Sequence, residues 1–253
     1  VEVDAQGRIV GCEEKPARPK AIPGRPGWCY VSMGIYLFTR PLIEEVLTED
    51  AQRADSTHDF GRDIIPTIAR SARVMAYTFR DEATQEPRYW RDIGTLDAYY
   101  EANADLLQVT PQFNLYDQDW PIRTYHEQWP PAKTVFADEA TGRVGKVLDS
   151  LVSNGCIISG GRVERSVLSP DVRVNSFASV EDSILMEHVE VGRYAKIRRA
   201  IIDKDVQIPR YAEIGYHLEE DRRRFTVTES GIVVVGKGTV IGEPRPAVSL
   251  AGT

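Results

Sequence analysis

Cysteine and histidine are scarce in this chain, and their scarcity excludes several classes of protein. The 253 residues include three cysteines and four histidines. Cys12, Cys29 and Cys156 form neither a C-x-x-C pair nor an even framework, which argues against a disulfide-stapled secreted domain and favours a reducing compartment. The histidines lack the spacing of zinc ligands. We therefore expect a cytoplasmic protein without a structural metal centre.

Long apolar runs, excess positive charge and phosphate-binding loops are also absent. No apolar stretch approaches the ~20 residues that a membrane span requires. The formal net charge of -7 argues against nucleic-acid binding, because proteins that follow phosphates need a positive surface. Neither G-x-x-x-x-G-K-[ST] nor G-x-G-x-x-G occurs. Val1 opens a hairpin-like pattern without an initiator Met, so we expect that the start of a longer protein is missing.

The first hundred residues alternate between strand-like and helix-like patterns. Residues 30–38, "YVSMGIYLF", show period-two alternation and predict a buried strand. One of its faces carries Ser32 beside Gly34, which is either a place where a ligand approaches the backbone or simply a tolerated small pair. Helices are predicted after Thr39 and within "HDFGRDIIPTIARS", and strands at 74–79 and 89–93. Such alternation is typical of an α/β sheet with helical cover.

Asp92 lies at the carboxyl end of the strand predicted at 89–93, just before a helix that Thr95 should cap. In open α/β sheets ligands bind at that edge, and a carboxylate there can hold a divalent cation. A carboxylate near a helix N-terminus can equally serve only to complement the helix dipole. One aspartate does not decide between the two roles.

The second half of the chain carries a hexapeptide repeat. Residues 108–135 first form a proline-punctuated segment, which we expect to be pinned down by its aromatic side chains: Phe113, Tyr116, Trp120, Tyr125 and Trp129. Apolar-x-apolar pairs then recur every five or six residues: Val172/Val174, Ala178/Val180, Ile184/Met186, Val189/Val191, Ala195/Ile197, Ala200/Ile202, Val206/Ile208 and Ala212/Ile214. This period predicts a parallel β-helix, in which stacking buries the inner face of each turn.

A β-helix names no reaction by itself. His188 is the single histidine within the regular repeats. We interpret it as a residue in a solvent-facing turn and not as the general base of an acyltransferase. Basic residues gather on the repeats, including Arg198, Arg199 and Lys204, with Arg222–Arg224 as an extension. They either capture a phosphorylated small molecule or form a solvated face balanced by acids.

Several motifs, taken together, resemble the bacterial glucose-1-phosphate adenylyltransferases. They include "EEKP", "YVSMGIYLF", "HDFGRDIIP", "YWRDIGTLDAYYEAN", "WPIRTY" and "PPAK". The resemblance implies a Rossmann-like nucleotidyltransferase domain followed by a left-handed β-helix. It also implies the synthesis of ADP-glucose and pyrophosphate from ATP and glucose 1-phosphate in glycogen biosynthesis, with Mg²⁺, in a cytoplasmic homotetramer that phosphorylated effectors and an AMP-type inhibitor regulate.

The resemblance also assigns roles to residues of this chain. Glu14 resembles the carboxylate that accepts hydrogen bonds from the glucose hydroxyls, and Lys15 the ammonium that pairs with the sugar phosphate. Ser32 resembles a hydroxyl that contacts the sugar, and Asp92 one of two magnesium ligands. Lys204 stands where relatives carry an arginine of the inhibitor site, so lysine loses the bidentate fork there. With Arg198 and Arg199 it forms the expected effector site.

These expectations divide the chain into three parts. Residues 1–110 are the carboxyl-terminal part of a nucleotidyltransferase domain, 111–138 an extended linker, and 139–253 the oligomerising β-helix. Because the glycine-rich loop and the second metal ligand of the family lie upstream, we expect the chain alone to be inactive. Two other hypotheses stay open: a non-catalytic regulatory or scaffold polypeptide, and a sibling transferase that uses another nucleotide or sugar.

Overall fold

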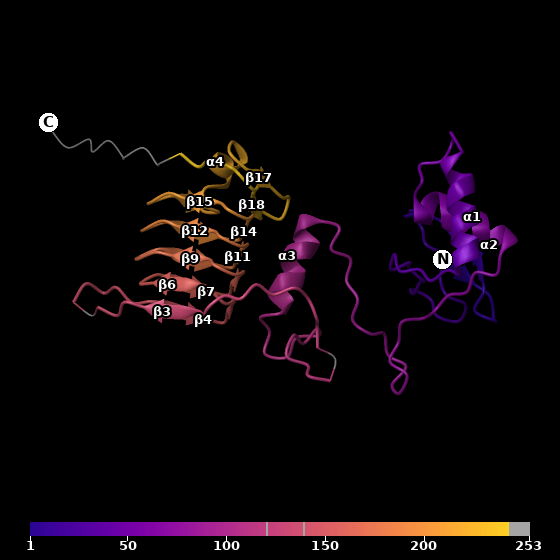
Figure 1. Ribbon diagram of the computed structural model, residues 1–253, viewed down its shortest axis with the longest axis horizontal. Coiled ribbons are helices and arrows are strands. Elements are labelled where there is room, and N and C mark those ends of the chain that lie inside the picture. The colour runs from indigo at the N-terminus through magenta and orange to yellow at the C-terminus, as the bar shows by residue number, and fades with distance from the viewer. Residues whose placement is uncertain (120, 139, 243–253) are drawn as a thin grey trace. The chain divides into compact units, whose positions relative to one another are not determined.

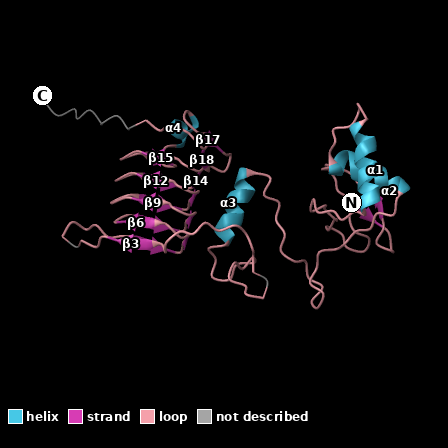
Figure 2. Cartoon of the chain, in the orientation of Figure 1, coloured by secondary structure: helices cyan, strands magenta, loops and turns pink. Residues whose placement is uncertain are grey.

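The computed structural model describes residues 1–119, 121–138 and 140–242. The chain divides into two compact units, Val1–Trp90 and Arg91–Thr253. Each unit has its own set of helices and strands (Figures 1 and 2). Among the described helices, none has both the length and the apolar character that crossing a bilayer demands.

The first unit combines a small hairpin with three helical segments. Strands β1 (Glu2–Val3) and β2 (Ile9–Gly11) pair antiparallel, as predicted. The helical segments are α1 (Arg40–Ala51), the π-helical turn η1 (Phe60–Ile64) and α2 (Ile65–Ser71). Thr39 precedes α1 in an extended conformation, and Asp59 caps η1 by accepting from the backbone N–H of Arg62. Both predicted helical regions are therefore confirmed.

The strand predicted at residues 30–38 is not present. These residues form no ladder, and Val31, Ile35 and Leu37 are 71%, 76% and 101% exposed. Residues 89–93 also lack strand structure, and the segment 74–79 pairs only through the bridge between Arg8 and Met75. A strand is stable only when neighbours pair its backbone groups and cover its faces. Within the described residues, no strand pairs with 30–38.

The second unit is a parallel β-helix, as the hexapeptide period predicted (Figure 1). One sheet contains β3 (Lys133–Val135), β6 (Ile157–Ser159), β9 (Arg173–Val174), β12 (Glu190–Val191) and β15 (Gln207–Ile208). The next contains β4 (Lys146–Leu148), β7 (Arg162–Glu164), β10 (Ser179–Glu181), β13 (Lys196–Arg198) and β16 (Glu213–Ile214). The third contains β5 (Leu151–Val152), β8 (Val167–Leu168), β11 (Ile184–Leu185), β14 (Ala200–Ile202) and β18 (Val233–Val235), with β17 (Thr226–Val227) antiparallel at its edge. Helix α4 (Leu218–Arg222) lies near the last turn.

One predicted repeat is out of register by one residue. Ser183 and Leu185 face the interior, whereas Ile184 and Met186 pack on the outside. The serine occupies an inner position, so the apolar pattern alone pointed to the neighbouring residues. With the observed register, equivalent residues in successive turns stand 17 apart, as Ser166, Ser183 and Ala200 do.

Buried serines link successive turns of the β-helix along this column. The Ser166 hydroxyl donates to the carbonyl of Glu164 (2.8 Å) and accepts from the backbone N–H of Ser183 (3.1 Å). The Ser183 hydroxyl repeats both bonds, with the carbonyl of Glu181 (2.6 Å) and the N–H of Ala200 (3.2 Å). Each hydroxyl thus satisfies a buried backbone N–H of the next turn. The carbonyls of Glu164 and Glu181 also accept from the backbone N–H groups of Asp182 and Arg199.

Aromatic residues form a stacked column at another corner. The rings of Phe177 and Tyr194 have centroids 4.9 Å apart, and those of Tyr194 and Tyr211 are 5.0 Å apart. All three residues have positive φ angles of 60–63°. The left-handed backbone turns each corner, and the stacking of the turns brings the rings into contact.

Helix α3 (Leu96–Asp105) packs on the outside of the β-helix. Tyr99 and Tyr100 contact the outer cluster of Ile184, Ile201 and Ile232. The Tyr100 hydroxyl donates to the carbonyl of Asp182 at 2.6 Å. This packing places α3 in the second unit, whereas the sequence suggested a first domain of 1–110; the boundaries at 110 and 138 remain predictions.

The segment before the β-helix is less covered than its aromatic content suggested. Tyr116 and Tyr125 are exposed, while the ring of Trp129 lies 5.8 Å from that of His188. His188 sits in a corner of the β-helix with φ 61°, and its Nδ1 lies 3.1 Å from Asp171. Trp120, which the sequence placed in the same aromatic set, falls outside the described residues.

Candidate functional site

Ser32 belongs to a cluster of hydroxyl and aromatic groups in the first unit. Its Oγ lies 3.0 Å from the hydroxyl of Tyr36 and accepts from the backbone N–H of Gly34 (3.2 Å). Gly34 has φ 68°, which an L side chain would strain. The Tyr36 ring stacks on Phe60, with centroids 5.6 Å apart and planes inclined by 17°. The cluster therefore offers hydroxyls beside an aromatic surface, a combination that suits a sugar.

Sequence reasoning assigned no role to Tyr36 or Phe60. A signal for Tyr36 existed, because it lies on the same face of the predicted strand as Ser32. No local pattern linked Ser32 or Tyr36 to Phe60. That contact depends on the loop that precedes η1, which returns to the 32–36 segment from more than twenty residues away.

Two carboxylates hold the loop that precedes Phe60. Asp50, buried at the end of α1, accepts from the Ser56 hydroxyl (2.7 Å) and lies 2.7 Å from Nδ1 of His58. Asp63 accepts from the Thr57 hydroxyl (2.5 Å) and from the backbone N–H groups of Thr57 and Asp59 (3.2 Å each).

These hydrogen bonds also change the acidity of both carboxyls. The bond to His58 is the largest of the effects that lower the pKa of Asp50. The bond from the Thr57 hydroxyl is the largest of those that lower the pKa of Asp63. Both groups are therefore held in the ionised form that accepts the loop's hydrogen bonds.

Glu14 lies against the start of η1. A Cβ at Gly61 would be 2.8 Å from Glu14 Oε2 and 3.3 Å from Asp59 Oδ1, so a side chain at residue 61 would displace the Glu14 carboxylate. Lys15 is 3.9 Å from Glu14 and its side chain is 91% exposed. The backbone φ of Lys15 is 44°, although the following Pro16 predicted an extended conformation. The structure thus brings Glu14 to Gly61, which adjoins Phe60, and leaves the Lys15 ammonium exposed beside Glu14.

Asp92 lies in the second unit, in a coil before α3. Its Oδ1 accepts from the backbone N–H of Gly94 at 2.9 Å, while Thr95 caps α3 by accepting from Ala98. The remaining lone pairs of this carboxylate suit a hard cation. In the described part of the chain, however, no group of three or more potential ligands gathers. Asp92 thus offers one ligand and needs others to complete a magnesium site.

The three predicted effector residues have separate surroundings. Lys204 pairs with Glu187 at 3.2 Å, and this contact raises the pKa of the lysine. The Arg198 guanidinium lies 4.7 Å from the ring centre of Tyr216, and that of Arg199 lies 5.7 Å from the ring centre of Tyr100. A hollow of about 370 Å³ lies at the far end of the β-helix, where Arg222, Arg223 and Arg224 line it.

Comparisons with known proteins bear on both units. Residues 1–109 match the nucleotidyl transferase family model, and residues 130–235 match that of the GlmU-like C-terminal hexapeptide. The chain is 53% identical, over 97% of its length, to the glucose-1-phosphate adenylyltransferase of Anaeromyxobacter dehalogenans. The protein of the same name from Koribacter versatilis is 52% identical over 93% of the chain, and that from Rhodopirellula baltica 52% over 96%. The chain is thus similar to glucose-1-phosphate adenylyltransferases over nearly its whole length.

The two family-model matches confirm the predicted order of domains, a nucleotidyl transferase domain followed by hexapeptide repeats. The chain covers 56%, 61% and 55% of the Koribacter, Anaeromyxobacter and Rhodopirellula relatives. It therefore spans less than two thirds of the adenylyltransferases that it matches. The roles of Glu14, Lys15, Ser32, Asp92, Lys204, Arg198 and Arg199 stay predictions.

Proposed function

We propose that this chain supplies the glucose 1-phosphate side of an enzyme that makes ADP-glucose from ATP and glucose 1-phosphate. The observation that carries the proposal is the cluster of Ser32, Tyr36 and Phe60, with Glu14 packed at the start of the same η1 turn. Hydroxyl and carboxylate groups beside an aromatic ring suit a glucose unit. The relatives' name gives the reaction in which such a site would be used.

The reaction moves an adenylyl group. A phosphate oxygen of glucose 1-phosphate forms a bond to the α-phosphorus of ATP while the bond from that phosphorus to the β-phosphate oxygen breaks, which releases pyrophosphate. In our proposal Lys15 pairs with the sugar phosphate, and Glu14 and Ser32 hold glucose hydroxyls. These contacts orient the attacking oxygen, and orientation contributes much of the catalysis in phosphoryl transfer.

Asp92 is our candidate for a magnesium ligand. Its carboxylate is exposed and accepts one backbone hydrogen bond, so it retains oxygen lone pairs for a cation. Mg²⁺ usually binds through one or two carboxylates together with substrate phosphates and water. When bound, the ion would neutralise the charge that develops on the transferred phosphates.

Regulation and assembly complete the proposal. Phosphorylated effectors and an AMP-type inhibitor would bind near Lys204, Arg198 and Arg199, extended by Arg222–Arg224, and the β-helix would assemble a cytoplasmic homotetramer. We place the enzyme in glycogen biosynthesis. The basic side chains on the β-helix support an anionic effector, because guanidinium and ammonium groups bind phosphate through charge-assisted hydrogen bonds.

Two protein forms test the proposal. One is this chain alone, for which we expect no turnover, since its sequence contains no glycine-rich phosphate loop. The other carries the preceding segment of the Anaeromyxobacter relative, joined upstream of Val1. The joined form should convert ATP and glucose 1-phosphate to ADP-glucose and pyrophosphate in the presence of Mg²⁺.

A panel of nucleotides and sugar phosphates distinguishes the other hypotheses. Faster turnover with UTP, GTP or dTTP would favour a sibling transferase. A folded, effector-binding protein that turns over none of them would favour the regulatory scaffold.

A further inference from the structure

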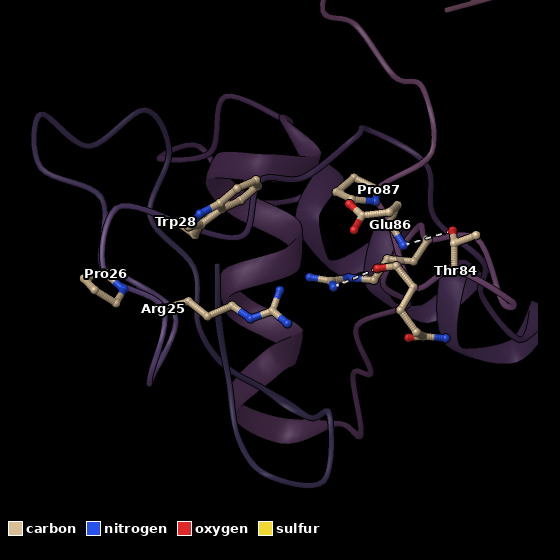
Figure 3. Close-up of a pocket in the computed structure, with 8 residues that line it drawn as sticks. Arg25, Pro26, Trp28, Thr84, Glu86 and Pro87 are labelled. Carbon is tan, nitrogen blue, oxygen red and sulfur yellow. Dashed lines mark hydrogen bonds between the residues drawn. The ribbon is translucent and has the colours of Figure 1, made fainter.

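The first unit contains a hollow that is separate from the candidate site. It has a volume of about 500 Å³, which is within the usual size of small-molecule sites. Arg25 and Trp28 line one side, and Arg80, Thr84 and Glu86 line the other. In Figure 3 the Arg25 side chain extends into the space between the two segments. Glu14, Lys15 and Ser32 are not among its lining residues.

Within the part of the chain that the structure describes, neither arginine of the hollow has an acidic partner. Other arginines of this unit form ion pairs, such as Arg53 with Asp55 (3.1 Å) and Arg88 with Asp81 (3.5 Å). Neither Arg25 nor Arg80 has such a pair with any carboxylate in the described residues. Two guanidinium groups and the single carboxylate of Glu86 give the lining a formal charge of +1. An anion is the ligand that this balance favours.

The two walls are formed by closed turns. The backbone N–H of Ile22 donates to the carbonyl of Trp28 (2.7 Å), which closes the loop that carries Arg25. On the other wall, Asp81 accepts from the N–H groups of Ala83 and Thr84 (3.0 Å each). The Arg80 guanidinium donates to the carbonyl of Gln85 at 3.1 Å. These bonds fix the backbone of both walls and hold the Arg80 side chain before any ligand binds.

Trp28 adds an apolar surface to the charged hollow. Trp28 is 59% exposed, so the indole is available for contact. Aromatic and sugar rings pack well against an indole, and guanidinium groups bind phosphate with paired N–H donors. We propose that this hollow is a binding site for a phosphate monoester that carries a ring. Arg25 and Arg80 take the phosphate, and Trp28 takes the ring.

The charge of Glu86 gives a second prediction, on the direction in which anion affinity changes. Its carboxylate repels the phosphate, so Glu86→Gln should tighten anion binding by about threefold, the effect expected for one like charge at a partly exposed site. A surface that does not bind anions would show no such gain in affinity in Glu86→Gln.

The test is a calorimetric titration of this chain with phenyl phosphate and with inorganic phosphate. Phenyl phosphate should bind about fivefold more tightly, which is the size of one aromatic contact. Arg25→Ala and Arg80→Ala should each weaken both ligands about tenfold, because each variant loses a charge-assisted hydrogen bond. Trp28→Ala should abolish the preference for phenyl phosphate and leave inorganic phosphate binding unchanged.

Controls separate this site from other anion sites. Arg53→Ala removes an arginine that is paired with Asp55 and should leave both affinities unchanged. Lys20→Ala, which removes an exposed lysine paired with Glu2, should also leave them unchanged. Arg25→Lys and Arg80→Lys, which keep the charge, should give intermediate affinities and guard against loss of folding. Wild-type affinity in both arginine-to-alanine variants, or equal loss in Arg53→Ala, would overturn the proposal.

Discussion

The hydroxyls of Ser32 and Tyr36 lie 3.0 Å apart, and this pair connects the predicted sugar site to the loop before η1. Tyr36 stacks on Phe60, and the residues just before Phe60 are held by Asp50 and Asp63. The position of the Ser32 hydroxyl therefore depends on carboxylates that make no contact with it. Changes in this connected set give the first tests of the site.

Tyr36→Phe should weaken the binding of glucose 1-phosphate while ATP binding stays the same. The substitution keeps the ring against Phe60 and removes the hydroxyl that fixes Ser32. One hydrogen bond contributes ~1 kcal/mol, so we expect about a fivefold rise in the KM for glucose 1-phosphate. Steady-state kinetics of the joined form would measure it, with exposed Tyr77→Phe as the control. Equal rises for both substrates would contradict the assignment.

Lys15→Ala should raise the KM for glucose 1-phosphate by at least about tenfold, because a charge-assisted bond to phosphate is lost. The KM for ATP should change little. Lys20→Ala is a matched control, since Lys20 is an exposed lysine that already pairs with Glu2. If Lys15→Ala affects both substrates alike, Lys15 does not bind the sugar phosphate.

Asp63 should make the stability of the first unit depend on pH in the acid range. Its pKa is lowered from 3.8, with the Thr57 hydroxyl as the largest cause. The ionised form therefore stabilises the folded state fully above about pH 3.8, and this contribution is lost as the pH falls through the lowered pKa. Asp63→Asn should reduce the loss of stability on acidification.

Urea unfolding between pH 2 and 6, followed by near-ultraviolet circular dichroism, would measure the effect of Asp63. Glu49→Gln, an exposed change on α1, is the control. Identical pH profiles for the wild type and Asp63→Asn would show that Asp63 does not stabilise the loop.

Ser183→Ala should destabilise the β-helix by ~1–3 kcal/mol, because it leaves the buried backbone N–H of Ala200 without its partner. Ser183 is 2% exposed and bonds both Glu181 and Ala200. Ser169→Ala, in a less buried position of the same domain, should change the free energy of unfolding by less than ~0.5 kcal/mol. Chemical denaturation of both variants gives the comparison, and similar values would refute the role of the serine column.

Local sequence signals predicted the elements that depend on neighbouring residues or on a repeated sequence pattern. Thr39 with Pro41, and Thr95 before α3, marked helices that the structure contains. The hexapeptide period predicted the β-helix because each turn repeats the same burial. It failed at Ile184 and Met186, where Ser183 takes an inner position. The Ser183 hydroxyl bonds Glu181 in its own turn and Ala200 in the next turn, and the second contact exists only in the folded β-helix.

The sequence alone determined the hexapeptide β-helix, the main helices and the candidate residues Glu14, Lys15, Ser32 and Asp92. Tertiary structure decided the rest. It placed Tyr36 beside Ser32 and stacked Tyr36 on Phe60. It also brought the Glu14 carboxylate close to Gly61 and placed Arg25, Trp28 and Arg80 around one hollow. Residues 30–38 form no strand, because alternation describes which faces a strand would bury but cannot supply the neighbours that pair its backbone.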